Sequence, residues 1–237
     1  MKFNLSKAKR AQKELRKKIE LNPLKKEPKL VAGCDLTFLD PYKTPTLGIG
    51  AFVVLKWPEL SLVEVQWEVL EIKIPYYPGF LAFREIPLLV KTFRKLKNKP
   101  DVVIVDGHGI AHPRRLGIAT HFGIVEKVPT VGCAKKPLYG KFKEPCKEKG
   151  CYEKIVDPKT QELIGFVLRT KNNVKPVYVS PGNLITFEEV IPLVNSLVTK
   201  YKLPEPTRLA HNYLQKIRKG IQNACNGKPT NSDKSLF

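Results

Sequence analysis

The order of strand-like and helix-like segments constrains the fold of this chain more than any other feature. Three strand-like runs, at 30–38, 47–55 and 61–72, follow one another with short gaps. The third run alternates apolar and polar residues, as a half-buried antiparallel strand does. Helix-like stretches then alternate with short strand-like runs. This order predicts an α/β fold with a central mixed sheet, antiparallel strands first and parallel strands after, flanked by helices.

Periodicity and turn residues place the other elements within one domain over residues 1–222. The predicted helices are 7–20 (capped by Ser6), 83–96, 116–125, 187–200 and 206–219, and the later strands are 102–105, 130–134, 163–169 and 177–179. No strand is predicted within the basic stretch 135–154. The polar segment 223–237, rich in Gly, Pro and Asn, is predicted to be a disordered tail.

The charge balance points to a polyanionic partner. Lys and Arg total 42 against 22 Asp and Glu, which leaves a net charge of +20. Such an excess attracts nucleic acid and speeds its capture, and this explanation is favoured over a role in solubility alone. An anionic membrane surface is a weaker alternative, because no long basic amphipathic helix stands apart from the predicted fold.

The sequence has neither a long apolar run nor a signal-peptide pattern at its N-terminus, so a cytoplasmic protein is expected. Its five cysteines include no CxxC pair, and reduced thiols are the default expectation. Cys146 and Cys151, five residues apart, leave two alternatives open, a bridge or a metal site.

Three carboxylates stand out in this basic chain. Asp35 lies inside the apolar run LVAGCDLTF, Asp106 ends the strand-like run of IVDG, and Glu85 opens a helix after PYYPG. A carboxylate in a buried strand costs free energy unless a cation or several donors meet it. Helix caps or surface ion pairs are the alternative roles. If the two strands are neighbours, the three acids converge, and hard oxygen ligands of this kind suit Mg²⁺ or Mn²⁺.

Six segments resemble, in order and spacing, the motifs of the endonuclease V family: VAGCDLTF, PYYPGFLAFRE, VVIVDGHGIAHPRRLGIATHFGI, GCAKKPL, VYVSPGN and LPEPTRLAH. They run from about Val31 to His211. The resemblance implies a ribonuclease H-like fold with five main strands. It also implies a metal-dependent monomer that cleaves DNA at the second phosphodiester bond 3′ of deoxyinosine, leaving 5′-phosphate and 3′-hydroxyl ends. Some members of the family cut inosine-containing RNA.

The resemblance also assigns roles to residues. Asp35, Glu85 and Asp106 match the family's metal-binding acids, and Mg²⁺ is the expected ion, with Mn²⁺ as a substitute. Lys135 matches a lysine that contacts the phosphate near the cut. His211 matches a histidine found near the metal in some members, whereas others carry an acid there. A surface or packing role is the alternative for His211.

Two further sets are implied for the damaged base. The turn Pro75, Tyr76, Tyr77 and Pro78 matches a wedge that enters the duplex as inosine rotates out, with Tyr76 leading. A rigid surface loop is the alternative. The pocket for the rotated base is expected to be lined by Gly79, Gly107, His112, Gly132 and Leu138, whose backbone groups can tell hypoxanthine from adenine.

Departures and rivals complete the prediction. His108 stands where the family also has Gln or Asn-like residues, a departure that could affect substrate handling. Asn183 stands where His is common in the family, and it receives no role. A ribonuclease H acting on RNA–DNA hybrids is the nearest rival, although it lacks the PYYPG and DGHGIAHPRR blocks. A basic RNA-binding protein without catalysis explains the charge but not the acids. A structural zinc site would rest on Cys146 and Cys151 alone.

Overall fold

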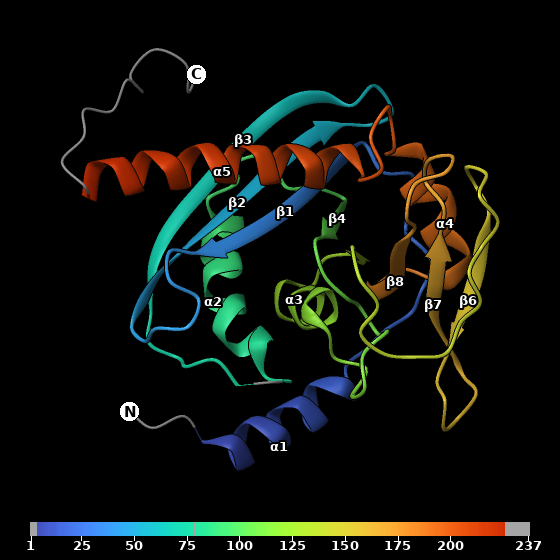
Figure 1. Cartoon of the computed structure of the whole chain (residues 1–237), viewed down its shortest axis with the longest axis horizontal. Coiled ribbons are helices and arrows are strands. Elements are labelled where there is room, and N and C mark those ends of the chain that lie inside the picture. The colour runs from blue at the N-terminus through green and yellow to red at the C-terminus, as the bar shows by residue number, and fades with distance from the viewer. Residues whose placement is uncertain (1–3, 78, 226–237) are drawn as a thin grey trace.

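The computed structural model describes residues 4–77 and 79–225 and contains an eight-stranded sheet with helices on both faces (Figure 1). The strand order is β3-β2-β1-β4-β5-β8-β7-β6. The predicted mixed α/β architecture is therefore confirmed. The first five strands in this order, β3, β2, β1, β4 and β5, correspond to the five expected main strands, and β8, β7 and β6 extend the sheet beyond β5.

The first half of the sheet follows the predicted runs closely. Strands β1 (Leu30–Phe38), β2 (Thr46–Lys56) and β3 (Ser61–Ile72) form an antiparallel meander. Strand β4 (Val102–Val105) pairs parallel with β1, and β5 (Thr130–Ala134) pairs parallel with β4. Every residue of β4 and β5 is buried. A strand that is covered on both faces reads as a continuous apolar run, which is why these bounds were predictable.

The other half of the sheet is antiparallel. It consists of β8 (Val177–Asn183), β7 (Leu163–Leu168) and β6 (Tyr152–Val156). Strand β6 was missed because it is an edge strand in which Ile155 alone is buried, so its charged sequence reads as a loop. The helices are α1 (Leu5–Arg16), α2 (Leu81–Arg94), α3 (Ile118–Glu126), α4 (Phe187–Ser196) and α5 (Glu205–Cys225).

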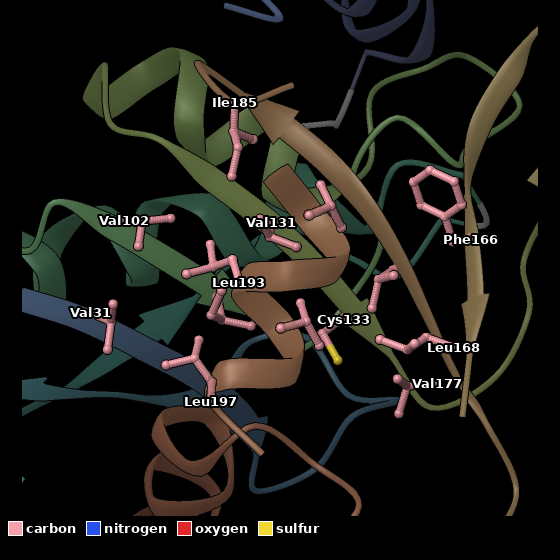
Figure 2. Packing of buried hydrophobic residues seen from close by; sticks show 14 of the residues in the cluster. Val31, Val102, Val131, Cys133, Phe166, Leu168, Val177, Ile185, Leu193 and Leu197 are labelled. Carbon is pink, nitrogen blue, oxygen red and sulfur yellow. The ribbon is translucent and has the colours of Figure 1, made fainter. Parts of the chain in front are cut away.

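The main core lies between the sheet and α4. Val31, Val131 and Leu193 belong to a cluster of buried hydrophobic side chains that spans β1, β2, β4, β5, β7 and β8 (Figure 2). A second cluster, which includes Phe52, Phe93 and Phe122, fills the opposite face under α2 and α3. Burial on both faces makes the sheet a rigid support for side chains at the ends of its strands.

The structure corrects two predictions about the chain termini. The cap of α1 is Asn4 rather than Ser6, because the Asn4 Oδ1 atom accepts a hydrogen bond from the Lys7 N–H group at 2.9 Å. At the other end, α5 continues to Cys225, past the predicted start of the tail at residue 223. Residues 226–237 of that predicted tail lie outside the described residues. Within the described chain, no helix is both long and apolar enough to cross a membrane.

Cys146 and Cys151 form a disulfide, so the default expectation of reduced thiols is wrong for this pair. Their Cα atoms are 5.6 Å apart in the loop before β6, within the usual span of such a bond. Arg169 supports the loop, since its side chain donates to the carbonyl groups of Cys146 and Pro145 and pairs with Glu144. Cys34 and Cys133 are buried free thiols.

Candidate active site

Neighbouring parallel strands bring Asp35 and Asp106 together. The last pair in the β1–β4 register is Cys34 with Val105, so Asp35 and Asp106 are the next residues along the two strands and lie at the same level. The Asp106 N–H group donates to the Cys34 carbonyl at 3.3 Å, which continues the ladder by one bond. The convergence expected of strands that lie side by side is therefore present for this pair of acids.

His211 reaches the same place from α5. Its Nδ1 atom lies 2.7 Å from the Oδ2 atom of Asp35, across 176 residues of sequence. An ionised carboxylate only accepts hydrogen bonds, so towards ionised Asp35 the Nδ1 atom of His211 is the donor. The helix can come this close because Gly33 has no side chain: a Cβ atom there would lie 2.2 Å from the Pro206 carbonyl carbon, at the first turn of α5.

Lys135, directly after β5, pairs with the second acid. Its Nζ atom lies 2.5 Å from the Oδ2 atom of Asp106. Burial by itself would lower the pKa of Lys135, but the hydrogen bond and the charge of Asp106 outweigh it and raise that pKa. The ammonium group therefore stays charged beside the acids, and 40% of its side chain remains exposed to an incoming ligand.

Glu85 completes the acidic group from α2. Its pKa is raised to about 8, first by burial and then by the charge of Asp35, with a smaller contribution from Asp106. The pKa of Asp35 is also raised, by burial and by Asp106. Carboxylates that disfavour each other's ionisation in this way need a cation to hold all of them charged.

No three His, Cys, Asp or Glu side chains in the described parts of the chain stand close enough together, as placed, to surround one ion. In this arrangement Asp106 is paired with the Lys135 ammonium group, and Asp35 is paired with the His211 ring. The donor set itself, three carboxylates from three elements, has the chemistry that a hard divalent cation requires.

A cavity of about 320 Å³ adjoins these acids, and we call it the Glu85 cavity. Glu85 and Asp106 form part of its wall, and Leu81, Leu116 and Ile118 supply apolar surface. Four residues predicted for the base pocket also line it: Gly79, Gly107, His112 and Leu138. A concave site with a mainly apolar wall and few polar groups is typical of small-molecule binding.

Gly132 is not among the residues that line the Glu85 cavity, and its role in the base pocket stays a prediction. It lies in β5 beneath the loop that follows β4. A Cβ atom at Gly132 would lie 2.3 Å from the Gly109 nitrogen and 2.6 Å from the Gly107 carbonyl oxygen. Gly132 therefore lets that loop pack directly on the strand, and it supports the cavity from below.

Two histidines in this loop are held neutral. Burial lowers the pKa of His112 to about 4, and the nearby Arg114 charge adds to the effect. The His112 Nδ1 atom accepts the Arg114 N–H group at 3.1 Å, which leaves Nε2 protonated as a donor. Burial also lowers the pKa of His108, whose Nε2 atom lies 3.1 Å from the Lys136 carbonyl oxygen. Both rings line the Glu85 cavity.

The predicted wedge lies at the rim of this cavity. Tyr76 is a lining residue and is 49% exposed, whereas Pro75 and Tyr77 are half-buried. Pro78 falls outside the described residues. The next residue, Gly79, has a φ of +78°, a left-handed conformation that favours glycine. Its carbonyl oxygen accepts from Arg114 and, at 3.1 Å, from Gln12 Nε2, so two side chains hold the turn in place.

Two residues near the site, Gln12 and Arg84, were not singled out from the sequence. Gln12 lines the Glu85 cavity although it lies on α1, far from any recognised motif. Arg84 is only 1% exposed; it donates to the Pro41 and Lys43 carbonyls and lies over the Phe38 ring at 4.3 Å. Buried helical Gln and Arg are visible to sequence reasoning only as breaks in an apolar face.

Asn183, to which no role was assigned, has a structural one. Its Oδ1 atom accepts the Glu20 N–H group at 2.9 Å, and its Nδ2 atom donates to the Gly123 carbonyl at 3.4 Å. Asn183 thereby ties the chain that follows α1 to α3 and to the end of β8.

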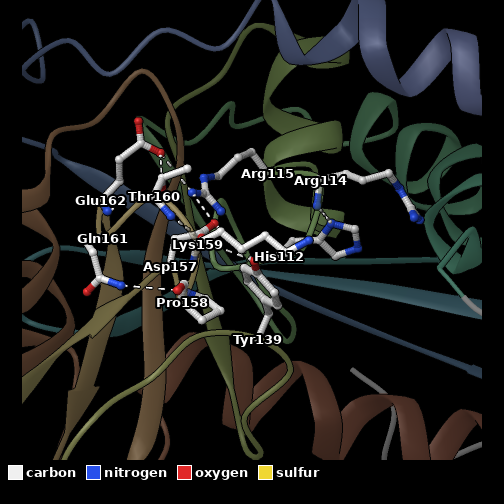
Figure 3. Close-up of polar contacts among 10 residues, drawn as sticks. All are labelled: His112, Arg114, Arg115, Tyr139, Asp157, Pro158, Lys159, Thr160, Gln161 and Glu162. Atoms are coloured by element: carbon white, nitrogen blue, oxygen red, sulfur yellow. Dashed lines mark hydrogen bonds and ion pairs between the residues drawn. The ribbon is translucent and has the colours of Figure 1, made fainter.

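A polar network fixes the end of the HPRR segment (Figure 3). The Arg115 guanidinium pairs with Asp157 at 2.7 Å and with Glu162 at 3.0 Å, and the Tyr139 hydroxyl donates to Asp157 at 3.2 Å. Backbone N–H groups, Lys159 foremost, and the Arg115 side chain lower the pKa of Asp157 to about 2. Arg115 has a φ of +59°, so the network holds a backbone conformation that this residue rarely adopts.

Comparison with known proteins places this geometry in context. A family model described as endonuclease V matches residues 13–212. The endonuclease V of Thermosipho melanesiensis is 47% identical over 208 residues, which cover 88% of each chain. That of Dictyoglomus thermophilum is also 47% identical over 208 residues, 87% of this chain and 88% of the relative.

Solved structures agree with these relatives. The endonuclease V of Bacillus subtilis superposes with a TM-score of 0.88 at 31% identity, covering 94% of this chain and 95% of that one. The endonuclease V of Ciona intestinalis, in complex with a 24mer DNA containing an inosine followed by a ribo-adenosine, gives a TM-score of 0.79 at 27% identity, covering 92% of this chain and 98% of that one.

Proposed function

Since the chain belongs to the endonuclease V family, we propose that it is a metal-dependent endonuclease that recognises deoxyinosine in DNA. It hydrolyses the second phosphodiester bond 3′ of the lesion and leaves 5′-phosphate and 3′-hydroxyl ends, which begins repair of the deaminated base. The inosine-containing DNA bound by the Ciona relative supports this choice of substrate.

One observation carries the proposal: a single cavity is walled by acids on one side and by base-pocket residues elsewhere. Glu85 and Asp106 line it together with Gly79, His112 and Leu138. A base rotated into such a cavity would place the phosphates that follow it beside the carboxylates. Neither a hybrid-cleaving ribonuclease nor a non-catalytic RNA-binding protein needs a base-sized cavity at this position.

Asp35, Glu85 and Asp106 are the residues that would hold the divalent cation, and Mg²⁺ is the proposed ion, with Mn²⁺ as a substitute. The fit rests on their shared character as hard oxygen donors and on the raised pKa values of Asp35 and Glu85, which a cation would reverse. When bound, the ion supplies an activated water and stabilises negative charge on the phosphate.

The chain's own side chains orient the reacting groups. Lys135, charged and 40% exposed, is suited to bind a non-bridging oxygen of the scissile phosphate. This contact would draw it away from Asp106 and free that carboxylate. His211 orients Asp35 through Nδ1, and its Nε2 atom can accept a proton from a water beside the phosphate.

Recognition of the base is assigned to neutral donors and backbone groups. The His112 Nε2–H group and the backbone of Gly79 and Gly107 offer hydrogen bonds to the edge of hypoxanthine, and Leu138 covers its face. Pro75, Tyr76, Tyr77 and Pro78 form the proposed wedge, with Tyr76 filling the stack that the base leaves.

Inosine-containing RNA is a proposed second substrate, and the enzyme is proposed to act as a monomer in the cytoplasm. The decisive experiment compares Mg²⁺-dependent cleavage of matched DNA and RNA strands that carry one inosine or one adenine at the same position. We expect cleavage of the inosine DNA strand. Equal cleavage of inosine and adenine strands would contradict the proposed specificity, and preference for the RNA strand would reverse the order of substrates.

Substitution of the acids tests the metal assignment. Asp35→Asn and Asp106→Asn should abolish cleavage while much of the binding to inosine DNA is retained, because the basic surface is unchanged. Asp40→Asn is the matched control, since Asp40 pairs with Lys43 on the surface. A variant of either site acid that keeps near wild-type turnover in saturating Mg²⁺ would remove that residue from the site.

A further inference from the structure

Helix α1, which lies beside the Glu85 cavity, has a strongly basic exposed face. It carries five basic residues and one acid, Glu14, and the basic residues are all exposed: Lys7, Lys9, Arg10, Lys13 and Arg16. Glu14 is paired with Lys17, just beyond the helix. The proposed function leaves this concentration of positive charge without a role.

The helix is fixed to the cavity rather than loosely attached to the domain. Ala8 and Gln12 are buried, and Gln12 Nε2 donates to the Gly79 carbonyl oxygen. Beyond the helix, Glu20 is held by Asn183 through its N–H group and by the Leu184 N–H group through its carbonyl oxygen. The exposed basic face therefore has a defined position relative to the wedge turn.

The same Gln12 side chain points to an incoming ligand. It is 2% exposed and lines the Glu85 cavity, and its Oε1 atom has no hydrogen-bond partner among the described residues. A buried acceptor without a partner is unfavourable, so a donor from a bound molecule would be stabilised there. Helix α1 thus contributes both a wall to the cavity and a charged surface outside it.

The position of α1 relative to the acids indicates which part of a substrate it meets. Helices α1 and α5 lie at opposite edges of the molecule in Figure 1. His211 of α5 contacts Asp35, so the reacting centre lies toward α5, whereas Gln12 walls the cavity from the α1 side.

We propose that α1 binds the sugar–phosphate backbone on the 5′ side of the rotated base. This inference rests on the proposed function. A cut on the 3′ side of the lesion places the part of the strand that follows the base beside the acids, and it leaves the part that precedes the base to α1. An anionic membrane does not fit this helix, since its less polar face is packed against the protein.

The test compares binding of two single strands that have the same length and composition. One carries inosine next to its 5′ end, and the other carries it next to its 3′ end. Binding is measured by fluorescence anisotropy in chelator, so that no cleavage takes place. The α1 variant is Lys9→Gln/Arg10→Gln/Lys13→Gln. The matched control is Lys25→Gln/Lys29→Gln/Lys97→Gln, which removes the same charge from exposed positions. These three lysines precede β1 and β4, whereas Asp106 follows the far end of β4.

We expect the α1 variant to bind the strand with the long 5′ flank more weakly than the wild type, and to bind the other strand with little change. The control should leave both affinities nearly unchanged. If each of the three residues contacts one phosphate, the slope of log K against log salt should fall by about 2, at about 0.7 for each single-strand contact. Raising salt fourfold would then cost the wild type about 15- to 20-fold more affinity than the variant.

Equal losses on the two strands, equal losses in the two variants, or no loss in the α1 variant would each overturn the proposal. Circular dichroism of the α1 variant at the assay temperature shows whether it is folded, and Gln12 is left in place so that the cavity wall is retained. The proposed function is tested separately, by Mg²⁺-dependent cleavage by the wild type of the strand that carries inosine next to its 5′ end, so the two can fail independently.

Discussion

Replacement of Gly33 by alanine tests how α5 brings His211 to Asp35. The strand and the helix meet at Gly33, where a Cβ atom would lie 2.2 Å from both the Pro206 carbonyl carbon and the Thr207 nitrogen. These are backbone atoms, and ordinary van der Waals contact begins near 3.4 Å. Since backbone cannot rotate out of the way, the first turn of α5 must move by an ångström or more, as the difference between 2.2 and 3.4 Å shows.

The displacement should reduce both stability and activity. Overpacking of this kind typically costs about 1–3 kcal/mol, and for a domain of this size each kcal/mol lowers Tm by about 2–4 °C. We therefore expect a fall in Tm of about 2–12 °C for Gly33→Ala. The 2.7 Å contact between His211 and Asp35 should lengthen at the same time, so cleavage at a temperature where the variant is fully folded should also slow.

Gly220→Ala provides a control on the same helix. Nothing lies within 4 Å of a Cβ atom at Gly220, and alanine is favoured over glycine in a helix interior by about 1 kcal/mol. The Tm should therefore rise for Gly220→Ala and fall for Gly33→Ala, and only Gly33→Ala should slow cleavage. A Gly33→Ala protein with wild-type Tm and turnover would refute the close packing of α5 on β1.

Three further predictions concern substrate binding and the polar network. Tyr76→Ala should weaken binding to a duplex inosine by about five- to a hundredfold, the value of about 1–3 kcal/mol for base–aromatic stacking, with a smaller loss on single strands; titrations of both forms check this, and a duplex-selective loss in Tyr77→Ala instead would make that ring the wedge. Binding to undamaged DNA should weaken steeply as salt rises, while the preference for inosine over adenine persists, since the preference depends on hydrogen bonds to the base edge. Competition assays across a salt series measure both quantities, and a preference that declined as fast as the affinity would contradict the pocket assignment. The pKa of Asp157 is about 2 in the folded protein and 3.8 when unfolded, so the ionised carboxylate stabilises the fold at pH values above 3.8, and this stabilisation is lost as the pH falls toward 2. Asp157→Asn should therefore lower the Tm at neutral pH and make the Tm fall less steeply between pH 3.8 and 2. If the dependence of Tm on pH were the same in the variant and the wild type, the Arg115 network would not contribute to stability.

Local sequence was sufficient for most of the sheet. The bounds of β1, β3, β4 and β5 coincide with the predicted runs, because burial on one or both faces leaves an apolar pattern with a period of two or a continuous apolar run. The positions of Asp35 and Asp106 within and after such runs already marked them as a potential site. Where burial is slight, as in β6, the pattern fades and the strand was missed.

Residue chemistry alone did not determine which groups meet. The disulfide between Cys146 and Cys151 depends on a loop geometry that the spacing of five residues allows but does not require. Gly132 reads like the other pocket glycines in sequence, yet the packing of the β4 loop against β5 puts it beneath the cavity. Asn183 received no role from its motif, and its hydrogen bond to Glu20 exists only because β8 ends beside the chain that leaves α1.

The sequence by itself determined most of the secondary structure and the directions of the first five strands, and it marked the three acids as candidates, because these depend on periodicities and residue types within a few turns of chain. The tertiary structure decided the partners: His211 with Asp35 across 176 residues, Lys135 with Asp106, and Gln12 with Gly79. These pairs depend on the parallel register of β1 and β4, on where α5 crosses β1, and on where α1 meets the turn at Gly79. Such contacts are set by packing of whole elements, and no short stretch of sequence encodes them.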